Sequence, residues 1–233
     1  MHLHPLILFF ETLLILFVFN ASSYFRTTTY VKSIDSIGVA LTIFLLFWIW
    51  LNSRFHFGYG KEDLGLITNS VSRRHWKVIF VIVILLYFVA CTAELVFPSE
   101  VKGELTLIEL FLTAVFTLTF GPIFEELLFR GYLFKRSQDA LQIKDITKIS
   151  IASIFSGLAF SFWHLPTPLI LIYFNDPIIE VYENLLAFVL FASVMGIILG
   201  EIRRRTKSIL PGVILHFCAN SIYVITLVLR LLF

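Results

Sequence analysis

The chain has 233 residues, of which 58% are hydrophobic, 15% are charged and 26 are phenylalanine, with a formal net charge of +2. This composition is too apolar for a soluble globular domain and is typical of a polytopic membrane protein. The basic residues form short clusters between apolar runs, so they indicate membrane topology, and we predict no nucleic-acid partner. The two cysteines, Cys91 and Cys218, lie in apolar segments, which excludes a disulfide framework and a cysteine-rich metal site.

The apolar runs are long enough to cross a bilayer as helices, because a hydrocarbon core of about 30 Å takes ~20 helical residues. The first run contains Glu11 and follows no positively charged region, so we expect a retained helix and not a cleaved signal. We predict an all-α fold: a single integral membrane domain over 1–233, built as a transmembrane bundle of about seven or eight helices. The runs are 5–22, 36–53, 77–97, 105–135, 147–166, 181–200 and 208–232.

The loops between these runs differ in their basic residues. Counted with the basic residues at the ends of the flanking runs, the second, fourth and sixth loops hold 13 lysines and arginines, whereas the opposite side holds 4. Short loops rich in Lys and Arg stay cytoplasmic, so we expect a cytoplasmic N-terminus in a multi-pass membrane protein. The compact length favours a prokaryotic plasma membrane over a eukaryotic endoplasmic-reticulum membrane. The second loop, 54–74, is interpreted as a solvated connector whose basic end anchors the next helix at anionic headgroups; a short surface helix is the alternative.

One run combines charged residues with a helix-breaking pair. The run 105–135 is longer than a single span needs and contains Gly121-Pro122, followed by Glu125, Glu126 and Arg130. Proline removes a backbone donor and clashes with the preceding turn, so a kink or break is predicted there. A charge at the bilayer centre costs roughly 2.5–3.5 kcal/mol on insertion scales, which makes this cluster a functional-site hypothesis.

Three patterns with i,i+4 spacing place polar groups on three predicted helices. They are Glu125-Glu126-x-x-x-Arg130, Phe160-x-x-x-His164 and His216-x-x-x-Asn220. At a rise of ~1.5 Å per residue from the cytoplasmic loops, Glu125, His216 and Asn220 lie about 13–20 Å deep and His164 about 24 Å, or less with tilt. We therefore predict one site in a polar cavity near the middle of the membrane.

A carboxylate, two imidazoles and an amide suggest hydrolysis. Glu126 and Arg130 lie one helical turn apart, either supporting the site or forming a purely structural ion pair, which leaves Glu125 to take a proton from water as general base. His164 would position that water or pass on its proton. His216 and Asn220, one turn apart, would donate hydrogen bonds to a developing oxyanion.

A metal site is the main chemical alternative, because two histidines and a glutamate are zinc-type ligands. The spacing argues against it: no HExxH pair is present, and asparagine is a poor zinc ligand. We predict no metal and no cofactor. Several other ionisable residues have no evident role: Glu94 and Glu109 lie near helix ends, Glu11 lacks a partner, and solvated positions are expected for His2, His4, His56 and His75.

At these residues the chain resembles the CPBP family of intramembrane glutamate proteases, also called the Abi or CAAX-protease and bacteriocin-processing family. The likeness covers roughly 105–225 and includes EELLFR before Gly131, FSFWH, and HFCAN after SILPG. It implies a membrane-embedded catalytic core over 105–225 in which a glutamate activates water without a metal. Carried over by motif, Glu125 is the base, Glu126 and Arg130 its support, His164 a water-positioning or proton-transfer residue, and His216 with Asn220 the oxyanion stabilisers.

The resemblance leaves the substrate open, because the family includes type II CAAX prenyl endopeptidases and proteins linked to bacteriocin maturation or self-immunity. We expect an endopeptidase that cleaves a membrane-associated peptide or protein in the lipid bilayer. A non-catalytic immunity or scaffold protein that binds a peptide through the same cavity is the alternative. A transporter with a Glu/His proton relay is a third, which the lack of an internal repeat weakens.

Overall fold

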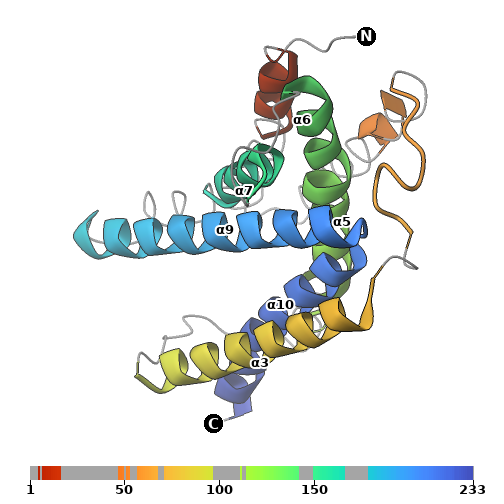
Figure 1. Ribbon diagram of the computed structural model, residues 1–233. Coiled ribbons are helices and arrows are strands. Elements are labelled where there is room, and N and C mark those ends of the chain that lie inside the picture. The colour runs from red at the N-terminus through yellow and green to blue at the C-terminus, as the bar shows by residue number, and fades with distance from the viewer. Residues whose placement is uncertain are drawn as a thin grey trace.

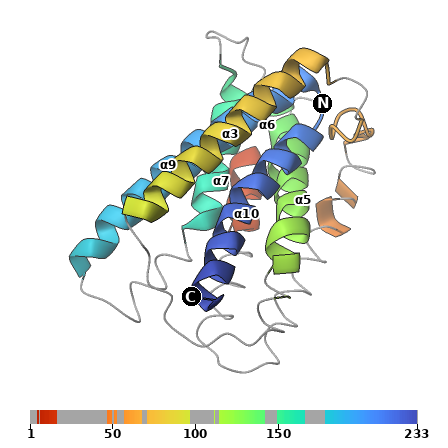
Figure 2. The same ribbon diagram turned by 90° about the horizontal axis from the view of Figure 1, so that it is seen from below.

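The computed structural model describes residues 5, 7–16, 47–49, 51–52, 57–67, 71–96, 111, 114–141, 149–165 and 178–232. All regular elements within these ranges are helices, which confirms the predicted all-α fold. Figures 1 and 2 show two views of their arrangement. In chain order they are α3 (Arg73–Val96), η2 (Phe116–Phe120), α5 (Gly121–Glu126), η3 (Leu127–Leu133), α6 (Phe134–Leu141), α7 (Ile151–His164), α9 (Ile178–Thr206) and α10 (Leu210–Leu232).

The helix ends differ from the predicted runs where basic residues were assigned to loops. Arg73 begins α3, so the basic end of the second loop forms the first turn of that helix. The cluster Arg203–Arg205, expected in a loop, is the last turn of α9, where cations complement the negative end of the helix dipole. Helix α6 continues to Leu141, although a loop was expected from Arg136 onward.

The sequence predicts helices that span a membrane. Of the helices in the described ranges, none is both long and apolar enough to cross a membrane. The first two predicted runs are described only at 5, 7–16, 47–49 and 51–52, where the chain is helical. Glu94 lies on α3, whereas the predicted positions of His2, His4, His56 and Glu109 lie outside the described residues.

Of the kink or break predicted at Gly121-Pro122, the break does not occur. The chain is helical from Ala114 to Leu141, and Phe120 has helical dihedral angles, φ −65° and ψ −43°. In Figure 1 the segment from α5 to α6 forms one continuous green column. The irregularity takes another form: the backbone is a π-helix in η2 and again in η3. Pro122 then lies in the first turn of α5, a position that tolerates a missing N–H.

Helices α7 and α9 cross so closely that their backbones are in direct contact at two glycines. A Cβ built on Gly196 would lie 2.7 Å from the Cα of Gly157, and one built on Gly157 would lie 2.6 Å from the backbone nitrogen of Ile197. No side chain fits at either position without moving a helix. Because Gly196 also contacts the candidate site described below, this crossing positions α9 against it.

We expect Gly196→Val to destabilise the protein by about 1–3 kcal/mol, because the added carbons force the two backbones apart. The free energy of unfolding, measured by denaturant titration in detergent micelles, would report this change. Gly60→Val is the control, since a Cβ there meets only the carboxylate of Asp63, at 3.7 Å. Equal unfolding free energies for Gly196→Val and the parent protein would contradict this account of the crossing.

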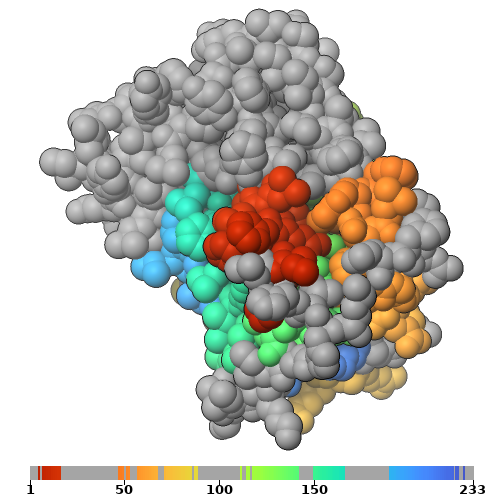
Figure 3. All heavy atoms as spheres, turned by 90° about the horizontal axis from the view of Figure 1, so that it is seen from above, coloured from red at the N-terminus to blue at the C-terminus, as the bar shows by residue number. Residues whose placement is uncertain are grey.

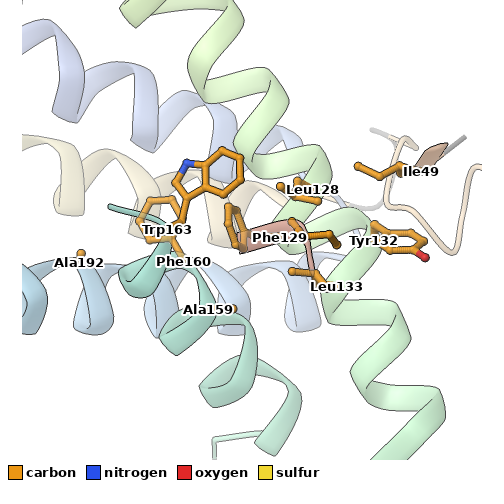
Figure 4. Close-up of a cluster of buried hydrophobic side chains, with 10 residues drawn as sticks. Ile49, Leu128, Phe129, Tyr132, Leu133, Ala159, Phe160, Trp163 and Ala192 are labelled. Atoms are coloured by element: carbon orange, nitrogen blue, oxygen red, sulfur yellow. The ribbon is translucent and has the colours of Figure 1, made fainter. Parts of the chain in front are cut away.

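Aromatic side chains of η3 and α7 form the core beside this crossing. Phe129 meets Phe160 and Trp163 edge to face, with ring centroids 5.3 and 5.4 Å apart. Figure 4 shows Phe129 between Trp163 on one side and Tyr132 on the other. Such edge-to-face pairs contribute roughly 0.5–1.5 kcal/mol beyond their area burial, and the rigid rings hold η3 against α7.

Glu11, for which the sequence offered no partner, anchors the N-terminal segment. Its carboxylate accepts hydrogen bonds from Arg136 and from the hydroxyl of Tyr132. The guanidinium of Arg136 also lies 3.8 Å from the centroid of the Phe57 ring. Figure 3 shows this segment, in red, between α7 (teal) and the orange segment that includes Phe57. Arg136 is 1% exposed. It is therefore a buried structural cation of α6, whereas the basic-residue count places it in a loop.

Candidate active site

Glu126 and Arg130 form a completely buried ion pair. Their i,i+4 spacing places them on one face, and Arg130 Nη1 lies 2.9 Å from Glu126 Oε1 with neither side chain exposed. Arg130 Nη2 donates to the carbonyl of Gly196 at 3.2 Å, and its guanidinium lies 4.3 Å from the centroid of the Phe160 ring. The cation is thus held by a carboxylate, a carbonyl and an aromatic face, which fixes the carboxylate of Glu126 in turn.

The first turn of α10 passes directly against Glu126. A Cβ built on Gly212 would overlap the carboxylate of Glu126. Only glycine lets the α10 backbone come this close to a charged group. The close approach places His216, one turn further along α10, beside both glutamates.

Glu125 lies between two imidazoles from different helices. Glu125 Oε2 is 3.5 Å from His164 Nε2 on α7 and 3.5 Å from His216 Nε2 on α10. The other nitrogen of His216, Nδ1, lies 3.5 Å from Glu126 Oε1. The structure thus brings five of the six predicted residues into one cluster, contributed by α5, η3, α7 and α10.

The backbone determines which nitrogen of His164 carries a proton. His164 Nδ1 lies 2.8 Å from the carbonyl oxygen of Phe160, one turn earlier on α7. A carbonyl can only accept, so Nδ1 must carry the hydrogen. In the neutral ring Nε2 is then a bare acceptor that faces Glu125. The pair of His164 and Glu125 can therefore share or exchange one proton.

His216 has both ring nitrogens directed at carboxylate oxygens. Neutral imidazole donates from one nitrogen only, whereas imidazolium donates from both. With His216 as imidazolium, its charge and that of Arg130 balance the two glutamates. The 3.5 Å separations exceed the ~2.7–3.2 Å of ordinary N–H···O hydrogen bonds, and Glu125 Oε2 is buried without a close donor in the described structure.

Asn220 is placed differently from the other five residues. Its Nδ2 donates to the carbonyl of Thr117 at 2.9 Å. Thr117 belongs to η2, the π-helix immediately before Gly121-Pro122. Asn220 therefore ties α10 to this π-helix one turn beyond His216, an arrangement that the sequence did not suggest.

Arg203, which the sequence indicates only as a topology signal, binds backbone carbonyls beside the site. It is 5% exposed, and its Nε donates to the carbonyl of Arg130 at 3.3 Å. Its Nη2 donates to the carbonyls of Asp63 at 2.8 Å and Glu62 at 3.3 Å. Burial lowers the pKa of Arg203 to about 10, against the opposing charge of Asp63, so the group stays cationic at neutral pH. Arg203 thus holds η3 and the loop 57–67 together.

The loop 57–67 is shaped around this guanidinium and is not simply solvated. Gly65 has φ +73°, and a Cβ there would lie 2.5 Å from Arg203 Nε. The Gly65 carbonyl accepts from the backbone N–H of Ile209 at 3.0 Å, and Tyr59 is 8% exposed. In its described part, 57–67, this connector has no helix, and it is partly solvated: Tyr59 and Gly65 are buried, whereas Lys61 and Glu62 are exposed.

A metal site was the chemical alternative for these residues. Within the described ranges, no three histidine, cysteine, aspartate or glutamate side chains are arranged to hold a metal ion together. In this cluster the carboxylates of Glu125 and Glu126 contact imidazole and guanidinium groups.

Comparison with known families matches part of the chain to a family model. Residues 107–222 match the model of a family described as type II CAAX prenyl endopeptidase, Rce1-like. The matched stretch is about half of the chain and contains all six predicted site residues. No curated protein and no solved structure matches the chain.

Proposed function

Because the chain belongs to the Rce1-like family of type II CAAX prenyl endopeptidases, as its three motifs indicated, we propose that it is an intramembrane endopeptidase of the glutamate type. Its substrate would be a membrane-associated peptide or protein, with a prenylated C-terminal segment or a bacteriocin-like peptide as the two classes that the family resemblance suggests. Glu125 would activate the water that attacks the scissile carbonyl.

The single observation that carries this proposal is the different surroundings of the two adjacent glutamates. Glu126 is neutralised by Arg130 at 2.9 Å, whereas Glu125 Oε2 faces two imidazole nitrogens at 3.5 Å. A general base must be a proton acceptor that is not already paired with a permanent cation, and it needs a neighbouring group that relays the proton. Glu125 with His164 meets both conditions, and Glu126 does not.

In the proposed reaction, Glu125 takes a proton from water as the water oxygen bonds to the carbonyl carbon. The oxyanion that forms accepts a hydrogen bond from His216, with Asn220 contributing the N–H that does not bind Thr117. When the C–N bond breaks, the leaving nitrogen receives the proton held between Glu125 and His164. Atoms balance: one water is consumed, and one carboxyl and one amino terminus are formed.

Exposed apolar side chains support a location in the membrane. Phe80 and Phe88 on α3 are 63% and 69% exposed, and Leu190, Phe191 and Val194 on α9 are 55–56% exposed. Large exposed apolar patches are typical of surfaces that contact lipid or other proteins. We propose a multi-pass integral membrane protein with a cytoplasmic N-terminus, in a prokaryotic plasma membrane.

Chelation distinguishes glutamate from metal chemistry. The full chain, purified in detergent, would be incubated with a prenylated peptide or a membrane-anchored bacteriocin precursor, and the products identified by mass spectrometry. We expect cleavage of at least one substrate at a rate unchanged after dialysis against a strong chelator. Activity lost on chelation and restored by zinc would overturn the glutamate mechanism. Absence of cleavage of both substrate classes would overturn the proposed activity.

A further inference from the structure

A cavity of about 580 Å³ lies between the first turns of α3 and the last turns of α9, beside the start of α7. Its volume falls in the range of roughly 300–1,000 Å³ that is usual for small-ligand sites. None of its lining residues is among the six predicted site residues. In Figure 2 the helices α3 and α9 run in opposite directions, so the first turn of α3 and the last of α9 lie at the same end.

The rim of this cavity is positively charged. Arg74 and His75 come from α3, and Arg205 comes from α9 with its side chain 56% exposed. Glu201 also lines the cavity and accepts from Arg205 Nε at 2.9 Å. Partial burial disfavours its charged form, but hydrogen bonds from Arg204 and Arg205 outweigh this and keep the pKa of Glu201 below its usual value. The lining thus carries the guanidinium groups of Arg74 and Arg205 and one carboxylate, that of Glu201, beside the positive end of the α3 dipole.

The walls of the cavity are apolar. Ile197 and Ile198 on α9 and Ile149, just before α7, line it, and Ile149 is 43% exposed. A ligand that fits must therefore carry a negative group at one end and hydrocarbon at the other. A free phosphate ion would leave the isoleucines uncovered, and a neutral lipid would give Arg74 and Arg205 no anion besides Glu201.

We propose that this cavity binds one anionic phospholipid, with its phosphate against Arg74 and Arg205 and an acyl chain along the isoleucines. In the proposed topology, the basic residues of α3 and α9 would lie at the cytoplasmic membrane face, where anionic lipids concentrate. The proposal rests on the proposed membrane location and not on the peptidase chemistry. Ile197 follows Gly196, whose carbonyl accepts a hydrogen bond from Arg130. A lipid in the cavity would therefore lie next to a residue that holds Arg130 in the candidate active site.

Native mass spectrometry of the full chain tests the proposal. The protein would be equilibrated in dodecyl maltoside micelles containing phosphatidylglycerol, then in micelles containing phosphatidylcholine. We expect one phosphatidylglycerol molecule to be retained by the parent protein and no phosphatidylcholine. The retained fraction should fall about tenfold in the double variant Arg74→Gln with Arg205→Gln, since each cation near a lipid surface contributes substantially to anionic-lipid binding. Excess inorganic phosphate should not displace the lipid.

Two matched controls separate a site from general surface charge. Arg73→Gln with Lys77→Gln removes two neighbouring cations that do not line this cavity, and should leave retention unchanged. Ile198→Trp fills the apolar wall and should abolish retention, whereas Leu190→Trp, at an exposed position on the same helix, should not. The proposal is overturned if both double variants lose lipid equally, if phosphatidylcholine is retained as well, or if phosphate alone displaces the lipid. Should one cavity variant fail to fold, the other decides the outcome.

Discussion

Replacing Glu125 with glutamine is expected to lower kcat for peptide cleavage by about 10²–10⁴-fold, the usual contribution of a positioned general base. Glutamine keeps the shape of the side chain but cannot take a proton from water. The side chain of Glu125 contacts imidazoles only at 3.5 Å, so its neutral replacement should fold and purify like the parent protein. Progress curves with a cleaved peptide, measured across substrate concentrations, would show a loss in kcat with little change in KM.

The matched control for this experiment is Glu62→Gln. Glu62 lies on the loop 57–67, where its backbone carbonyl, and not its side chain, binds Arg203. This variant should retain full activity. Retained proteolysis by purified Glu125→Gln would show that another group activates water. If a protective phenotype in cells survives Glu125→Ala combined with His164→Ala, the biological role is non-enzymatic binding, as in the immunity or scaffold alternative.

Replacing Arg130 with methionine is expected to lower the free energy of unfolding by about 3–5 kcal/mol. Removing one partner of a buried pair leaves the other charge in a poorly solvating interior. Glu126 is 0% exposed, and Arg130 also donates to Gly196 and lies over the Phe160 ring, so three contacts are lost together. Denaturant unfolding in micelles, followed by tryptophan fluorescence, would measure the change.

A second substitution distinguishes the unpaired charge from lost packing. In Arg130→Met combined with Glu126→Leu neither charge of this pair remains, and apolar replacement of a whole buried pair is often neutral or stabilising. We therefore expect the double variant to recover most of the stability while remaining inactive. If the double variant is as unstable as Arg130→Met alone, packing by the arginine, and not its charge, supports the cluster. A single variant with unchanged stability would contradict the ion-pair account altogether.

The amino-acid sequence was sufficient for features that depend on one helix at a time. The i,i+4 spacing of Glu126 and Arg130 predicts their contact because residues four apart share a face at a rise of ~1.5 Å each. The same reasoning predicts similar membrane depths for the carboxylates and imidazoles, and that depth stays a prediction. The all-α fold followed from continuous apolar runs, and the family from the three motifs together.

Contacts between helices required the tertiary structure. Glu11 and Arg136 lie 125 positions apart, and Arg203 and Arg130 lie 73 apart. A cation in a basic cluster has the same local sequence whether it is solvated or buried, so Arg136 and Arg203 were both interpreted as topology signals. Spacing along a helix also says nothing of its rotation toward its neighbours, which directs Asn220 to Thr117.

The backbone irregularity near Gly121-Pro122 was also predicted only in part from the sequence. Gly121-Pro122 indicated that the hydrogen-bond ladder must change there, because proline has no N–H to give. Whether the helix breaks or shifts to π geometry depends on the neighbours that hold it, here including α10 through Asn220. Local chemistry thus determined which residues carry charge and where regular hydrogen bonding must fail. How the charged residues meet was decided by the tertiary structure. It depends on the crossing of Gly157 with Gly196, the approach of Gly212 to Glu126 and the burial of Arg203. Each of these features is a distance between segments remote in the chain.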